Sequence, residues 1–99
     1  VATLEEGKRA AALGADLVAT TLSGYVGPGP VPDDPDVDLV RRLSRAVKIP
    51  VVAEGRYRTP EQVAQAFRAG AFAVVVGRAI TDALAITKTF VDTLKDVHR

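Results

Sequence analysis

The feature that most constrains this chain is an internal repeat, in which two segments match at a constant offset of 56 positions. Each segment begins with Thr, has Glu two residues later and ends in Gly-Ala. The matched pairs are Thr3 with Thr59, Glu5 with Glu61, Ala10 with Ala66, Gly14 with Gly70, and Ala15 with Ala71. Such an offset spans two βα units, as expected if strands 6 and 8 of a barrel arose by duplication.

The hydrophobic periodicity predicts helices that alternate with short strands rich in Val and Ala. Thr3 and Thr59 can cap their helices, and Gly14 and Gly70 can end them in the left-handed conformation. The predicted elements are helices 3–14, 36–47 and 59–70, strands 16–20, 51–54 and 72–76, and a further helix after residue 77. The segment 28–35, rich in Gly, Pro and Asp, is a predicted surface loop. This order of elements is typical of parallel α/β folds.

Three strands cannot close a barrel, so the predicted fold class is α/β, the C-terminal half of a (βα)₈ TIM barrel with strands 6 to 8. Residues 1–99 would then form a single partial domain. The chain opens on a helix and therefore looks truncated, with the N-terminal half-barrel as its missing partner. Because bare apolar strand edges favour association, we also expect a homo-oligomer. The alternative is a small open sheet that is complete in itself.

Composition excludes several classes of protein. The net charge is +1 with acids and bases mixed along the chain, so no basic stripe is present to bind nucleic acid. The longest apolar stretch, 71–76, is far shorter than the roughly 20 residues that cross a bilayer, and we expect a cytoplasmic protein without membrane contact. The sequence has no Cys and a single His, His98, which we interpret as a solvated residue near the terminus, so we expect no metal site.

In barrels of this kind the reactive groups lie just after the C-terminal ends of the strands. Glu54 ends an otherwise apolar strand, where a carboxylate must either find a partner or act chemically. We interpret Glu54 as a catalytic proton carrier. The alternative is a structural ion pair with Arg56 or Arg58.

Two glycines, Gly55 and Gly77, follow neighbouring strands, and each is followed by an arginine, Arg56 or Arg78. Bare backbone N–H groups and these side chains form a predicted phosphate site, although glycine is also an ordinary turn residue. A cluster of hydroxyls after the first strand is suited to binding a sugar or an acetamido group, or to simple turn chemistry. These hydroxyls belong to Thr20, Thr21, Ser23 and Tyr25.

Across nearly its whole length the chain resembles the bacterial N-acetylmannosamine-6-phosphate 2-epimerases. The runs that carry the resemblance are TLEEG (3–7), LGAD (13–16), TTLSGY (20–25), IPVVAEGR (49–56), TPEQ (59–62), VVVG (74–77) and AIT (79–81). TTLSGY and AEGR are specific together, whereas GAD and VVVG recur in many phosphate-binding barrels.

The resemblance implies a (βα)₈ enzyme of sialic-acid breakdown that inverts C2 of a phosphorylated amino sugar without a cofactor. It implies that Glu54 and a lysine upstream of this chain move the C2 proton, and that a supporting aspartate would fall immediately before Val1. Arg78 stands where the family commonly has a second glycine, and Asp82 where many members have a phosphate-binding arginine. The alternatives are another phosphate-binding barrel, such as a relative of indole-glycerol-phosphate or thiazole synthases, and a non-catalytic half-barrel.

Overall fold

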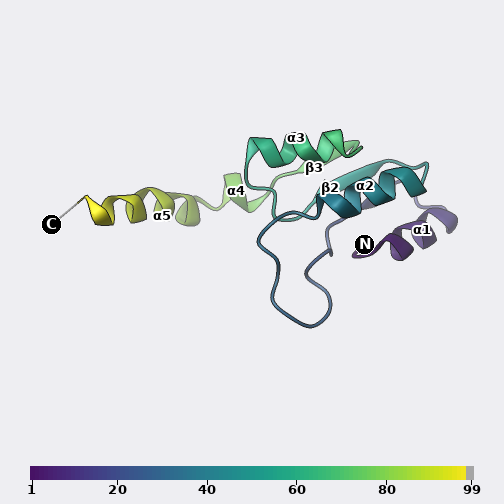
Figure 1. Cartoon of the computed structure of the whole chain (residues 1–99), viewed down its shortest axis with the longest axis horizontal. Coiled ribbons are helices and arrows are strands. Elements are labelled where there is room, and N and C mark those ends of the chain that lie inside the picture. The colour runs from purple at the N-terminus through teal and green to yellow at the C-terminus, as the bar shows by residue number, and fades with distance from the viewer. Residues whose placement is uncertain (98–99) are drawn as a thin grey trace.

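The computed structural model describes residues 1–97 and shows helices packed on a small parallel sheet (Figure 1). The elements in chain order are α1 (Leu4–Ala12), β1 (Val18–Ala19), α2 (Val37–Ala46), β2 (Val51–Glu54), α3 (Pro60–Arg68), β3 (Ala73–Val75), α4 (Arg78–Thr81), α5 (Ala83–Thr93) and the 3₁₀ helix η1 (Leu94–Asp96). The predicted alternation of helices and strands is confirmed. His98 lies outside the described residues.

Two strands are shorter than the sequence pattern predicts. The predicted strand 16–20 pairs only over Val18–Ala19, and the predicted strand 72–76 only over Ala73–Val75. The register gives a reason at two of the ends, because Leu17 would face Pro50, which has no N–H, and Val76 would face Gly55, where the chain turns with a φ of 116°. Single hydrogen bonds extend the pairing at either end, such as Val18 N–H to the Pro50 carbonyl at 3.0 Å.

The internal repeat is also a repeat of structure. Helices α1 and α3 are both nine residues long and keep the offset of 56 positions. Each begins with a capping box. The threonine hydroxyl, of Thr3 or Thr59, accepts from the backbone N–H three residues later, at Glu6 or Gln62, and the side chain of that residue accepts from the backbone N–H of the threonine. Each ends at a glycine with φ near +100°, Gly14 at 97° and Gly70 at 111°. The predicted caps and stops are confirmed.

The sheet has the order β1-β2-β3, and both strand pairs are parallel. Helix α1 contacts β1, α2 contacts β2 and α3 contacts β3, so the three helices form one layer. Side chains alternate along β2, with Val51 and Ala53 buried toward this layer and Val52 and Glu54 on the other face, half-buried. Because the strands are parallel, their C-terminal ends lie at one edge of the sheet.

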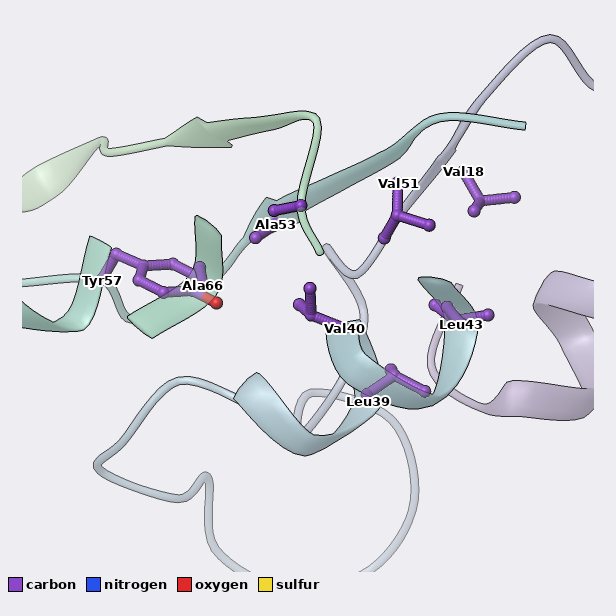
Figure 2. Close-up of a cluster of buried hydrophobic side chains, with 9 residues drawn as sticks. Val18, Leu39, Val40, Leu43, Val51, Ala53, Tyr57 and Ala66 are labelled. Atoms are coloured by element: carbon purple, nitrogen blue, oxygen red, sulfur yellow. The ribbon is translucent and has the colours of Figure 1, made fainter. Parts of the chain in front are cut away.

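The core lies between the sheet and α2 (Figure 2). Val40 and Leu43 of α2 are fully buried and point toward Val51 of β2. Helix α1 comes close to α2 at Gly7, where a Cβ atom would overlap with Cδ2 of Leu43. The absence of a side chain at Gly7 therefore sets how closely α1 packs on α2.

Helices α4 and α5 extend away from the sheet and its helical layer (Figure 1). The described chain measures 60 × 29 × 19 Å and has a radius of gyration of 16.2 Å. A compact chain of this length would have a radius of gyration of about 13 Å. Large apolar side chains on this extension are consequently exposed, among them Ile80, Leu84 and Phe90.

Candidate active site

The structure brings the residues at the three strand ends to one edge of the sheet. Glu54 pairs in register with Val75, so Gly55 after β2 and Gly77 after β3 lie at neighbouring strand ends. Thr20 directly follows β1, and its N–H donates to the Val52 carbonyl at 3.1 Å. Four of the site residues expected from the sequence, Thr20, Glu54, Gly55 and Gly77, therefore lie at this edge.

Glu54 is held by the two threonines that follow β1. The Thr20 hydroxyl donates to the Glu54 carbonyl and accepts from the Glu54 N–H, both at 3.0 Å. The Thr21 hydroxyl donates to Oε1 of the Glu54 carboxylate at 2.5 Å. Thr20 is buried, with 2% of its surface exposed, whereas Thr21 is exposed. The backbone of Glu54 is therefore fixed by Thr20, and its carboxylate is oriented by Thr21.

The two arginines considered as structural partners of Glu54 contact the loop between β1 and α2 instead. Arg56 donates to the backbone carbonyls of Ser23 at 2.6 Å and Asp34 at 2.8 Å. Arg58 forms an exposed ion pair with the Asp34 carboxylate at 3.2 Å. The structure thus shows a hydroxyl, and not a guanidinium, beside the Glu54 carboxylate.

The two other predicted hydroxyls differ in their environments. Ser23 is buried, and its hydroxyl donates to Oδ2 of Asp36 at 2.5 Å. Oδ1 of Asp36 accepts from the Leu39 N–H at 2.9 Å and so caps α2. Tyr25 is half exposed, and its ring centroid lies 5.2 Å from Cζ of Arg56, within cation–π range. Ser23 supports the loop, and Tyr25 is available at the surface.

Two further residues, Asp36 and Tyr57, were not among the site residues predicted from the sequence. Asp36 precedes an amphipathic helix and could be recognised as a cap, but its contact with Ser23 depends on the path of a long loop. Tyr57 is 3% exposed, and burial raises the pKa of its hydroxyl. The nearby charge of Asp36 raises this pKa further, and that of Arg56 lowers it.

The residues after β3 that were predicted to bind phosphate, Gly77 and Arg78, lie at the start of the short helix α4. Gly77 is its N-cap, and nothing within 4 Å would meet a side chain there, so its backbone borders open space. Arg78 pairs with the Asp82 carboxylate at 3.4 Å. Asp82 also caps α5 by accepting from the Ala85 N–H at 3.1 Å, and these two hydrogen bonds lower the pKa of Asp82, the one from Ala85 most. The acid at position 82 is therefore paired with the neighbouring Arg78.

Within residues 1–97, no group of three or more Asp, Glu or His side chains is arranged to hold a metal ion. No helix in the same range is long and apolar enough to cross a membrane.

Comparison with known proteins gives consistent matches over the whole chain. Residues 1–96 match the family model NanE, described as "Putative N-acetylmannosamine-6-phosphate epimerase". A Bifunctional enzyme NanE/NanK from Brucella melitensis is 52% identical over 99 residues, which are all of this chain and 19% of that protein. Among curated relatives from Clostridium perfringens, the chain spans 43% of the length of each.

Solved structures agree with the sequence matches. The N-acetylmannosamine-6-phosphate 2-epimerase from Clostridium perfringens superposes with a TM-score of 0.84 at 48% identity, covering 94% of this chain and 41% of that one. The M276A mutant of FabK from Thermotoga maritima superposes with a TM-score of 0.63 at 33% identity, covering 80% of this chain and 26% of that one. These neighbours are TIM-barrel enzymes matched over part of their length, which confirms the predicted fold class of a partial barrel.

Proposed function

The chain belongs to the NanE family of N-acetylmannosamine-6-phosphate epimerases, and on this premise we propose that the protein containing it converts N-acetylmannosamine 6-phosphate to N-acetylglucosamine 6-phosphate. The observation that carries the proposal is the carboxylate of Glu54, a half-buried residue at the C-terminal edge of the sheet, which is oriented by the Thr21 hydroxyl. A carboxylate in this position can move a proton to or from a substrate bound at the barrel mouth.

The reaction needs two proton transfers at C2. In the open-chain sugar, C2 lies next to the C1 carbonyl, so loss of the C2 proton leaves the electron pair of the C–H bond delocalised onto the carbonyl oxygen. Return of a proton to the opposite face of C2 inverts the centre. Glu54 serves as one of the two proton carriers. The other, the lysine implied by the family resemblance, lies outside this chain.

The remaining residues of the edge divide into substrate contacts and supports. Gly55 and Gly77 offer backbone N–H groups to the phosphate, with Arg78 next to the second of them. Thr21 and Tyr25 are exposed and can contact the sugar hydroxyls or the acetamido group. Thr20 and Ser23 are buried, and their hydroxyls hold the Glu54 backbone and Asp36 in place.

The proposal is tested by comparing the full-length protein with the 99-residue chain. We expect the full-length protein to epimerise the substrate and to incorporate deuterium at C2 in deuterated water, as followed by proton NMR. The isolated chain should be inactive, because one proton carrier and much of the barrel wall lie outside it. Turnover by a verified 99-residue chain would contradict the assignment of the missing lysine, and an inactive full-length protein would contradict the function.

We further propose that residues 1–99 are one partial domain, completed by an N-terminal half-barrel, and that the isolated chain self-associates. Leu84 of α5 is 83% exposed, and Phe72 at the start of β3 is 72% exposed. Apolar surface and open strand edges of this kind favour association. Sedimentation should show dimers or larger species that bind a hydrophobic dye. A sharply monomeric species that binds no dye would argue against the partial domain.

A further inference from the structure

The turn after β2 has an unusual backbone at Arg56. Within residues 1–97, Arg56 is the only residue other than glycine with a positive φ, 64°, and it follows Gly55 at 116°. The left-handed conformation is strained for a residue with a side chain, so contacts elsewhere must compensate. Two successive left-handed residues turn the chain sharply at the end of the strand that carries Glu54.

The side chain of Arg56 supplies these contacts by joining the two limbs of the loop 20–36. Its Nη1 donates to the carbonyl of Ser23, just after β1, and its Nε donates to the carbonyl of Asp34, just before α2. The planar guanidinium can hold two acceptors in fixed directions at once, which a lysine ammonium on a flexible stem does poorly. The Tyr25 ring packs against the same guanidinium.

The loop is shaped to admit this guanidinium. A Cβ atom at Gly24 would lie 2.7 Å from Nη1 of Arg56 and 2.9 Å from Cδ of Pro32. Gly24 also has a φ of +83°, which residues with side chains rarely adopt. A glycine at this position therefore allows the two limbs of the loop to close around Arg56.

We infer that Arg56 is a positioning residue of the active site. Its place after Gly55 in the sequence predicted a ligand of the substrate phosphate, a role that we do not assign to it. It closes the loop 20–36 and thereby keeps the Tyr25 ring beside Gly55, where Cε2 of the ring is 3.8 Å from the position of an ideal Cβ. The ring therefore lies at the strand end, against the residue that follows Glu54. The effect on catalysis rests on the proposed function, because it acts through the contact of Tyr25 with the sugar.

The test uses the variants Arg56→Ala and Arg56→Lys in the full-length protein. If the loop opens, a smaller fraction of the protein molecules can bind the substrate. KM should therefore rise about tenfold, while kcat changes less than about threefold. Arg56→Lys should resemble Arg56→Ala, since an ammonium cannot hold both carbonyls. Inhibition by inorganic phosphate should be unchanged. Chymotrypsin should cleave after Tyr25 faster in both variants, as identified by the masses of the fragments.

The matched control is Arg58→Ala, which removes an arginine from the same turn but only an exposed ion pair with Asp34. Its KM and cleavage rate should stay within about twofold of the wild type. Weaker phosphate inhibition in Arg56→Ala that Arg56→Lys restores would overturn the inference in favour of a phosphate ligand. A lower melting temperature with unchanged KM would also overturn it. Because proteolysis needs no turnover, it tests the loop even if the proposed activity is absent.

Discussion

Replacement of Glu54 by Gln in the full-length protein is expected to lower turnover by about 10²- to 10⁴-fold. The amide matches the carboxylate in size and can still accept the hydrogen bond from Thr21, but it cannot transfer a proton. The backbone of this position is held by Thr20, whose two hydrogen bonds do not involve the substituted side chain. The variant should therefore remain folded and retain its affinity for the substrate.

The measurement is the rate of epimerisation and of deuterium incorporation at C2 in deuterated water, together with the melting temperature. Glu61→Gln is the matched control, because it makes the same change in an exposed carboxylate of α3 that pairs only with Arg68 among the described contacts. This control should behave like the wild type. Normal exchange at C2 by a stable Glu54→Gln variant would remove Glu54 from the catalytic step.

The second large effect is expected at the contact between α1 and α2. Leu43 is fully buried, and Leu43→Ala should lower the free energy of unfolding of the full-length protein by about 3 kcal/mol through lost burial and a residual cavity. Gly7→Ala should also destabilise the protein, by about 1–3 kcal/mol. Alanine normally improves a helix by up to about 1 kcal/mol over glycine, but here its methyl group would overlap with the Leu43 side chain.

These two substitutions should compensate each other. In the double variant the methyl group introduced at position 7 occupies part of the space vacated by Leu43, so the combined loss should be smaller than the sum of the single losses. Urea unfolding measures all three values. Lys8→Ala is the control, since this charged side chain of α1 is exposed and pairs only with Glu5 among the described contacts, so its replacement should change the free energy of unfolding by less than about 0.5 kcal/mol. Additive losses would show that the loss in Gly7→Ala does not come from its overlap with Leu43, and a stabilising Gly7→Ala would show that Leu43 has room to move aside.

Local signals predicted the elements of this fold well. The caps at Thr3 and Thr59 and the glycines at Gly14 and Gly70 depend on neighbouring residues alone, and the structure places all four as predicted. The strands were predicted too long, because the length of a ladder depends on the partner strand and not on the residues of one strand.

The strand-end position of Glu54 could likewise be predicted from the sequence, but its contacts could not. The partner of its carboxylate is Thr21, which is 33 positions away, while the nearby Arg56 reaches back across the loop to Ser23. Charge alone favoured an arginine as the partner of the acid. The left-handed turn at Arg56 directs the guanidinium to the loop, and no local sequence signal indicates such a turn at an arginine.

The unequal connections between the strands have a consequence for how this part of the chain closes during folding. Val18 pairs with Val51, whereas Val52 pairs with Ala73, so the first crossover is the longer, and the loop 20–36 lies within it. The entropic cost of closing a loop grows only with the logarithm of its length, so closing the longer crossover costs about 0.4 kcal/mol more than closing the shorter one. Residues can therefore be added to or removed from the loop 20–36 at small thermodynamic cost. The length of this loop can therefore vary between related proteins while the sheet stays the same.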